Sequence, residues 1–243
     1  MLEVRGLTKS FGALRACDGI DLEVREGETH AIIGPNGAGK TTFISQLAGN
    51  LMPDAGTVRF AGEDITRLPA HRRARKGLAR SFQITSVFLD FSALHNVALA
   101  VQSFNGRTGL WRPARADPAL IEPARRLLEQ VVLGARCDVP AVSMSHGEHR
   151  QLEVAMALAT EPRLLLLDEP MAGMGVEESQ RMIGLLGRLK QGKTIVLVEH
   201  DMDAVFRLAD RISVLVYGRV IATGVPEEIR ANKEVRKAYL GEA

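Results

Sequence analysis

The chain has 243 residues, enough for one large α/β domain or for a core with a smaller subdomain. Its 31 basic and 29 acidic side chains leave a formal net charge of +2, which gives no electrostatic footprint for nucleic acid. The two cysteines, Cys17 and Cys137, fit neither a disulfide framework nor a metal-site spacing and favour a reducing compartment. Neither a signal peptide nor a run of ~18 apolar residues is recognisable, so we expect a cytoplasmic protein.

The first third of the chain alternates between strand and turn patterns. Alternating apolar and polar residues predict strands over 2–7 and 20–24, with a turn at 9–12 between them. A buried strand at 29–33 feeds the Gly-rich segment 34–42, and a helix is expected to follow it. A hairpin, a short basic helix and a strand are predicted next, over residues 57–65, 68–77 and 78–82.

From about residue 84 to residue 160 the pattern becomes helical, with little strand signal. A Gly-, Arg- and Pro-rich stretch at 103–117, which contains Trp111, is typical of a surface loop. Helices are predicted over 92–101, 118–132 and 146–159. After residue 163 strands are expected at 164–167, 194–198, 211–216 and 220–222, and helices at 176–190, 202–208 and 227–240.

Residues 34–42 read Gly-Pro-Asn-Gly-Ala-Gly-Lys-Thr-Thr, which is the G-x-x-x-x-G-K-[ST] phosphate loop in its strand–loop–helix context. Its backbone N–H groups can wrap polyphosphate oxygens at the positive end of the helix. Lys40 can reach the β- and γ-phosphates, and the Thr41 hydroxyl is placed to ligate Mg²⁺. A Gly-rich turn that happens to carry a lysine is the alternative. The expected nucleotide contacts are Gly34, Asn36, Gly37, Gly39, Lys40, Thr41 and Thr42.

Two acids, Asp168 and Glu169, follow a run of four leucines. Such a run is typical of the centre of a parallel sheet, and ligands bind at the carboxyl ends of those strands. We expect Asp168 to hold Mg²⁺, directly or through water, and Glu169 to polarise the attacking water. Taken alone, the pair could also be a solvated acidic turn.

With both motifs present, the whole chain resembles the ATP-binding subunit of ABC transporters. The resemblance implies a P-loop NTPase (RecA-like) α/β core with an antiparallel β subdomain, over 1–83 and 161–243, and an inserted helical subdomain over 84–160. It implies ATP and Mg²⁺ as ligands and ATP hydrolysis coupled to transport. The implied partners are a second ATP-binding subunit (a copy or a paralogue), transmembrane permease subunits and, indirectly, a solute-binding protein, without nucleic acid. The chain would then lie at the inner face of the cell membrane.

The family's signature string, which is LSGGQ-like, matches residues 144–148. Ser145 is a plausible N-cap for the next helix, and a helix start with a free hydroxyl can bind an anion. The resemblance implies that Ser145 and Gly147 contact the γ-phosphate bound by the other subunit, whereas a simple helix cap is the alternative. His146 stands in place of the family's first Gly and Glu148 in place of its Gln, so this contact departs from the family pattern.

The resemblance adds three further site residues. Gln83 matches the Q-loop glutamine, which senses Mg²⁺ or the attacking water, and His200 matches the switch histidine at the γ-phosphate. Phe11 matches the aromatic residue on which adenine stacks, a contact worth about 0.5–1.5 kcal/mol. A surface glutamine, a structural histidine and a core phenylalanine are the respective alternatives. In the D-loop, residues 171–175, Gly175 replaces the usual acid.

Some stretches resemble one branch of the family, the ATPases of branched-chain amino-acid importers. They are residues 77–83, 145–148, 199–202 and 238–243. Urea or amide importers and the lipopolysaccharide-exporter ATPase look similar in the same regions.

Two other classes of protein remain as alternatives. A soluble ABC ATPase working on nucleic acid or ribosomes would usually carry two cassettes or a long coiled coil, and this chain has neither. An unrelated phosphate-loop kinase or GTPase is disfavoured by the string at 144–148 and by His200. The basic run at 71–76 is predicted to be a solvated helix face.

Overall fold

The computed structural model describes residues 1–81, 87–106 and 117–240. The strands are β1 (Leu2–Phe11), β2 (Leu14–Val24), β3 (Thr29–Ile33), β4 (Ala55–Phe60), β5 (Glu63–Asp64), β6 (Leu78–Arg80), β7 (Leu164–Asp168), β8 (Thr194–Val198), β9 (Arg211–Val216) and β10 (Arg219–Gly224). The helices are α1 (Lys40–Ala48), α2 (Ala70–Arg75), α3 (Ala93–Asn105), α4 (Pro118–Gln130), α5 (His146–Leu158), α6 (Val176–Leu189), α7 (Met202–Leu208), α8 (Pro226–Ala231) and α9 (Lys233–Leu240).

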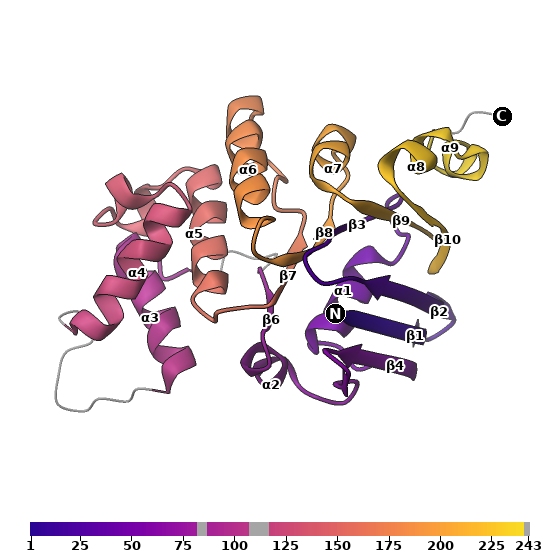
Figure 1. The fold of residues 1–243 in the computed structure, drawn as a ribbon, viewed down its shortest axis with the longest axis horizontal. Coiled ribbons are helices and arrows are strands. Elements are labelled where there is room, and N and C mark those ends of the chain that lie inside the picture. Colours follow the sequence, from indigo (N-terminus) through magenta and orange to yellow (C-terminus); the bar gives the residue numbers. More distant parts are fainter. Residues whose placement is uncertain (82–86, 107–116, 241–243) are drawn as a thin grey trace.

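The larger sheet has the strand order β10-β9-β3-β8-β7-β6, and all its neighbours pair in parallel except β9 and β10. The leucines of β7 alternate between its two faces. Leu165 and Leu167 belong to the core that includes α5 and α6, whereas Leu164 and Leu166 pack in the core of α1 and the smaller sheet. Figure 1 shows α6 and α7 on one side of the sheet and α1 on the other. The predicted strand buried on both faces is confirmed, and it lies between β8 and the edge strand β6 rather than at the centre of the sheet.

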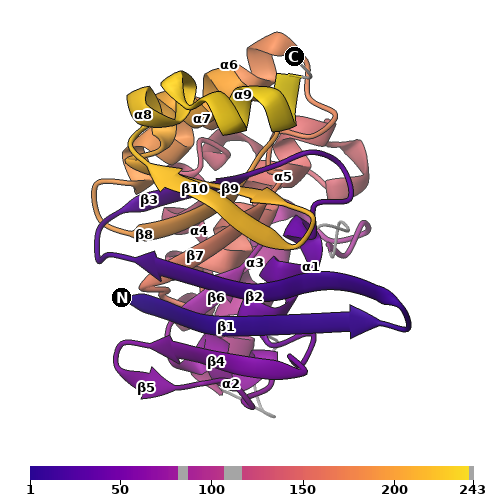
Figure 2. The ribbon, with the colours of Figure 1, turned by 90° about the vertical axis from the view of Figure 1, so that its right-hand side faces the viewer.

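The smaller sheet is antiparallel, in the order β2-β1-β4-β5, and lies below the larger one in Figure 2. The predicted turn at 9–12 is wrong, because β1 continues to Phe11 and β2 begins already at Leu14. Lys9 pairs with Cys17 and Phe11 with Leu14, so the hairpin closes over two residues only. Cross-strand pairing extends both strands beyond the stretch that alternates clearly in sequence.

The helices α3, α4 and α5 gather at the left of Figure 1, away from the smaller sheet. Their predicted positions agree with the structure to within a few residues at each end. The Ser92 side chain caps α3 by accepting from His95 N, and Asp117 caps α4 by accepting from Ala119 N. Among the described residues, none of the helices combines the length and apolar character needed to cross a bilayer. Trp111 lies outside the described residues.

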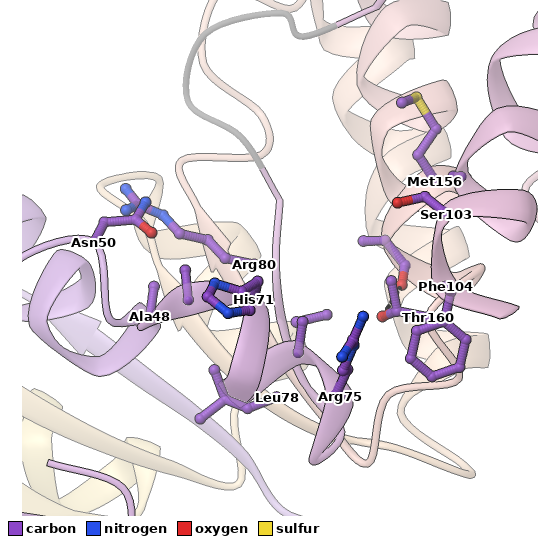
Figure 3. A pocket seen from close by; sticks show the side chains of 15 residues that line it. Ala48, Asn50, His71, Arg75, Leu78, Arg80, Ser103, Phe104, Met156 and Thr160 are labelled. Atoms are coloured by element: carbon purple, nitrogen blue, oxygen red, sulfur yellow. Dashed lines mark hydrogen bonds between the residues drawn. The ribbon is translucent and has the colours of Figure 1, made fainter. Parts of the chain in front are cut away.

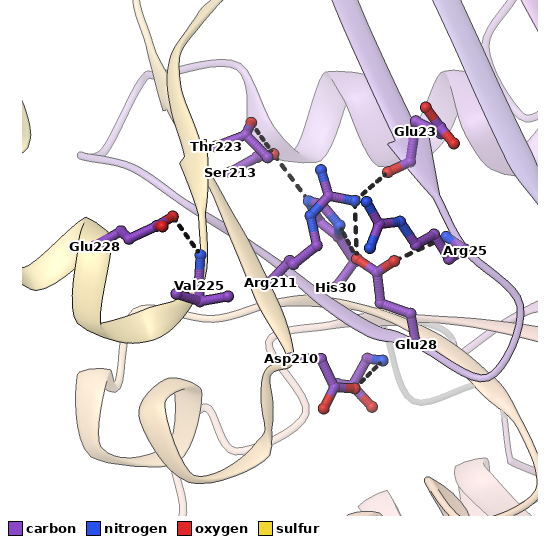
Figure 4. Close-up of polar contacts among 11 residues, drawn as sticks. Glu23, Arg25, Glu28, His30, Asp210, Arg211, Ser213, Thr223, Val225 and Glu228 are labelled. Atoms are coloured by element: carbon purple, nitrogen blue, oxygen red, sulfur yellow. Dashed lines mark hydrogen bonds and ion pairs between the residues drawn. The ribbon is translucent and has the colours of Figure 1, made fainter.

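A fully buried histidine ties β3 to β9 and β10 through a polar network, drawn in Figure 4. The ring of His30 bonds Glu28 Oε1 through Nδ1 at 2.6 Å and Ser213 Oγ through Nε2 at 2.8 Å. Ser213 Oγ in turn bonds Thr223 Oγ1 at 2.7 Å. Burial works to raise the pKa of Glu28, but His30 and the Arg25 N–H outweigh it and hold that pKa below its ordinary value. Buried polar groups are stable only when paired in this way.

The basic run at 71–76 is not simply a solvated face, since Arg73 is 0% exposed. Its guanidinium donates to four backbone carbonyls within 2.9 Å: those of Gln46, Leu47, Thr66 and Leu68. Two of these belong to the last turn of α1, where helical carbonyls have no partner and cations are favoured. Burial lowers the pKa of Arg73 to about 10, which still leaves it charged. Arg73 therefore anchors α2 to the end of the helix that the phosphate loop begins.

Arg73→Met is expected to destabilise the fold by about 3 kcal/mol, because several buried carbonyls lose their donor. Arg72→Met, which removes the neighbouring exposed guanidinium, is the matched control and should change stability by less than about 0.5 kcal/mol. Urea unfolding followed by circular dichroism measures both. Equal stability of the two variants would contradict the anchoring role.

Candidate functional site

The loop between β3 and α1 approaches two neighbouring backbone segments so closely that only glycine fits. A Cβ on Gly34 would lie 2.0 Å from Leu215 O, and one on Gly39 would lie 2.1 Å from Ala16 O. Gly39 also has a φ of 102°, in the left-handed region, at the N-cap of α1. The helix begins at Lys40, three residues earlier than the sequence suggested. The loop is thereby pressed against β9 and the start of β2.

The Lys40 side chain folds back over this loop and is 7% exposed. Its Nζ donates to Gly34 O at 2.7 Å and to Pro35 O at 3.1 Å. Burial lowers the pKa of Lys40, while the nearby Glu169 and Asp168 act to raise it. An ammonium held among carbonyls and close to two acids is placed to meet an anionic ligand.

The outer rim of the loop is open. Asn36, Gly37 and Thr41 are exposed, and Thr42 is half-buried. On the inner side, Gly218 N donates to Ala38 O at 2.9 Å. This contact comes from the turn between β9 and β10, which sequence reasoning missed because no local pattern marks it. The exposed N–H groups at the start of α1 remain available to an anion at this rim.

Asp168 is the last residue of β7 and is 1% exposed. Its Oδ2 accepts from the Arg80 guanidinium at 2.8 Å, and the same guanidinium donates to Ser45 Oγ of α1 at 3.1 Å. Burial raises the pKa of Asp168, although the charges of Arg80 and Lys40 act against it. The other oxygen, Oδ1, is buried and has no hydrogen-bond partner. A carboxylate oxygen left free in this way fits a hard cation such as Mg²⁺.

Glu169 follows with a strained backbone. Its φ is 49°, which is uncommon for a residue other than glycine and clusters at functional sites. The conformation is fixed from both sides, because Glu169 N donates to Val198 O at 2.9 Å and Ala172 N donates to Glu169 O at 3.1 Å. The half-buried side chain acts on the Lys40 charge, so both belong to one site.

His200 comes directly after β8 and is 59% exposed at its side chain. The residue before it, Glu199, is fully buried and accepts N–H groups from Met171 at 3.0 Å and from His200 at 3.0 Å. Burial raises the pKa of Glu199, and these N–H groups act against it. Glu199 thus fastens the loop that carries His200 to the D-loop, a link that sequence reasoning missed.

The signature string opens α5 with a complete capping box. Ser145 Oγ accepts from Glu148 N at 3.2 Å, and the Glu148 carboxylate accepts from Ser145 N at 2.8 Å. That carboxylate also pairs with Arg136, whose Nε lies 2.7 Å away. Burial works to raise the pKa of Glu148, but Ser145 N–H and Arg136 hold it below its ordinary value. Glu148, the acid in place of the family's Gln, therefore takes part in capping α5.

His146, the other departure from the family string, contacts the D-loop of its own chain. Its Nε2 lies 2.9 Å from Ala172 O, and a Cβ on Gly173 would lie 3.2 Å from the same nitrogen. The first turn of α5 and the segment after Glu169 are therefore in direct contact.

Phe11 lies at the end of β1 with 50% of its surface exposed, which excludes the core-packing alternative. Lys9 Nζ is 5.8 Å from the centre of its ring. Gln83 lies outside the described residues.

Arg80 also borders a hollow of about 430 Å³ between β6 and α2 on one side and α3 and α5 on the other (Figure 3). In Figure 3 His71 and Arg75 reach into it from α2, opposite Phe104 and Met156. Small apolar side chains make up much of the remaining wall: Ala48, Ala70, Ala74, Ala79, Ala100 and Ala157.

Comparison with known proteins agrees with this geometry. The model of the ABC transporter family matches residues 17–172, and that of the branched-chain amino acid ATP-binding cassette transporter matches residues 219–243. The chain is 41% identical to the high-affinity branched-chain amino acid transport ATP-binding protein BraF of Pseudomonas aeruginosa, covering 100% of this chain and 98% of that protein. It is 37% identical to LivG of Escherichia coli, which carries the same description, with the same coverage.

Solved structures with a similar fold are also ABC transporter cassettes. A nucleotide-free ATP-binding cassette from an ABC transporter superposes with a TM-score of 0.88 at 30% identity, covering 100% of this chain and 99% of that one. The ADP conformation of an ABC transporter cassette gives 0.87 at 29% identity, with the same coverage. The expected P-loop NTPase fold is confirmed. The chain belongs to the ABC transporter family and is an ATP-binding cassette, whose hydrolysis of ATP is coupled to transport.

Proposed function

We propose that this cassette hydrolyses Mg·ATP at the edge formed by the phosphate loop, Asp168 and Glu169, and that it powers uptake of branched-chain amino acids. One observation carries the catalytic part: the buried Lys40 ammonium and the buried Asp168 carboxylate lie at the carboxyl ends of the parallel strands, where the charge of Glu169 acts on both. Adenine stacks on Phe11, and the phosphates lie on the loop. The contacts come from Gly34, Asn36, Gly37, Gly39, Lys40, Thr41 and Thr42.

The chemistry follows from the positions of the side chains. Mg²⁺, when bound, neutralises phosphate charge, and Thr41, Asp168 and Gln83 would hold it. Glu169 orients the attacking water and accepts its proton, while Lys40 offsets the charge that develops on the γ-phosphate. His200 donates to that phosphate and keeps Glu169 in place.

Binding and hydrolysis of ATP also change how two cassettes pair. Two cassettes, either two copies or this chain with a paralogue, enclose ATP between the phosphate loop of one and the Ser145–Gly147 turn of the other. Hydrolysis removes the bridging phosphate and favours the open state, a shift set by differential contacts. Residues 84–160 form the part that moves against the α/β core, 1–83 and 161–243. The stretch from Gln83 to Asn96 passes this motion to the permease subunits, at the cytoplasmic face of the membrane.

The solute assignment has separate support. The full-length relatives BraF and LivG are described as branched-chain amino acid transport proteins, and the C-terminal family match covers residues outside the nucleotide motifs. A solute-binding protein would deliver the amino acid to the permeases.

Glu169→Gln is expected to leave ATP affinity unchanged and to lower the hydrolysis rate by about a hundredfold or more, because the amide cannot accept the proton of water. Glu122→Gln, on the exposed face of α4, is the control and should hydrolyse ATP at the unchanged rate. Phosphate release measures turnover and a fluorescent nucleotide measures affinity. An unaltered rate in Glu169→Gln would defeat the assignment.

Arg80→Met is expected to weaken binding of ATP in Mg²⁺ by about tenfold, because the Asp168 carboxylate loses the guanidinium that holds its Oδ2. Binding of ATP in the presence of EDTA should not change, since Arg80 contacts Ser45 and Asp168 rather than the phosphate loop. Calorimetric titrations with and without Mg²⁺ measure the two ATP affinities separately. Equal losses in both would mean that Arg80 only supports the fold.

Proteoliposomes that hold the chain with its permease subunits should take up leucine, isoleucine or valine when ATP is enclosed. Lys40→Ala should abolish this uptake, because the phosphates lose their buried cation. Radiolabelled leucine and urea, each added with the matching solute-binding protein, measure the choice of solute. Transport of urea alone would assign the chain to the amide importers instead.

A further inference from the structure

The donors at the start of α5 already hold an anion, and it comes from the same chain. Ser145 Oγ donates to Glu178 Oε1 in the first turn of α6 at 2.9 Å. The carboxylate also lies against the backbone of Gly147, and the N–H groups of Gly175 and Gly147 act to lower its pKa. Two of these three donors, from Ser145 and Gly147, are those expected to bind the γ-phosphate of the partner's ATP.

The carboxylate and a phosphate cannot occupy these donors together. A Cβ on Gly147 would lie 2.8 Å from the carboxyl carbon of Glu178, so the carboxyl group packs directly against the backbone there. The Ser145 hydroxyl, followed by the two backbone N–H groups, holds the pKa of Glu178 below its ordinary value. The Glu178 carboxylate therefore occupies the donors that the proposed pairing offers to a phosphate oxygen.

A hollow beside the Glu178 side chain offers space for another position of its carboxylate. Glu178 lines a hollow of about 490 Å³ together with Ser145, Gly147 and Arg181. The charge of Arg181, three residues further along α6, already acts on the Glu178 carboxylate. Rotation of this one half-buried side chain toward Arg181 would free the donors without any change in the backbone.

We propose that Glu178 competes with the γ-phosphate of the partner's ATP for Ser145 and Gly147, and thereby sets how much ATP is needed to pair two cassettes. The inference rests on the proposed pairing through the start of α5. In the separate subunit the carboxylate keeps these donors satisfied. ADP, which has no γ-phosphate to offer, leaves the carboxylate in place, so Glu178 helps to restrict pairing to the triphosphate.

ATP-driven pairing tests the proposal directly. In the Glu169→Gln background, which retains ATP, sedimentation velocity gives the ATP concentration at half-maximal pairing. Adding Glu178→Gln should lower that concentration at least about threefold, because a neutral amide binds the donors less tightly. Glu177→Gln removes the same charge from the neighbouring exposed position and should have no such effect. An unchanged value in Glu178→Gln, or an equal shift in Glu177→Gln, overturns the competition.

A second measurement does not depend on pairing. Inorganic phosphate is titrated into the isolated subunit, and the amide resonances of Gly147 and Gly39 are followed by NMR. Gly39 should respond in every variant, whereas Gly147 should respond in Glu178→Gln and not in the wild type or in Glu177→Gln. A Gly147 amide that stays unresponsive in Glu178→Gln overturns the inference. If no variant pairs with ATP, the proposed pairing fails, and the response of Gly147 still decides the role of Glu178.

Discussion

Because β3, β8 and β7 pair in parallel register, their carboxyl ends meet at one edge of the larger sheet. The phosphate loop, the acids after the leucine run and the loop that carries His200 are brought together by that pairing alone. The apolar side chains of these strands alternate between a helical layer on one face and α1 with the smaller sheet on the other. Packing on both faces keeps the edge in place, and the polar links of Glu199 and Arg80 then fix the loops along it.

The parts of this arrangement that sequence predicts have their causes within a few residues. The glycines of the phosphate loop, the leucines of β7 and the apolar run of β8 each specify a local conformation. Helix positions follow from apolar periodicity, and the Ser145 cap follows from the preference for serine at helix starts. Element ends are less well predicted. β1 extends to Phe11 because β2 pairs with it as far as Leu14, and that pairing leaves no mark in the sequence of β1 itself.

Charged side chains with distant partners could not be predicted. Arg80 and Asp168 are 88 residues apart, and Ser145 and Glu178 are 33 apart. In sequence Arg73, Arg80 and Glu178 resemble ordinary surface charges. Only the fold shows that they face carbonyls, a carboxylate and a helix start, respectively. Arg73 is the clearest case, because it lies in a basic run whose neighbours Arg72 and Arg75 are solvated as expected.

The buried carboxylate of Glu199 has a consequence for how this site can change over time. It faces backbone N–H groups with both oxygens, Oε1 toward Met171 and Oε2 toward His200 and Asp201. A glutamine would turn its own N–H₂ toward one of these donors, and a shorter side chain would leave them bare in a dry interior. A single substitution of Glu199 is therefore expected to destabilise both loops. A descendant of this chain can lose that glutamate only if both loops it joins are rebuilt at the same time.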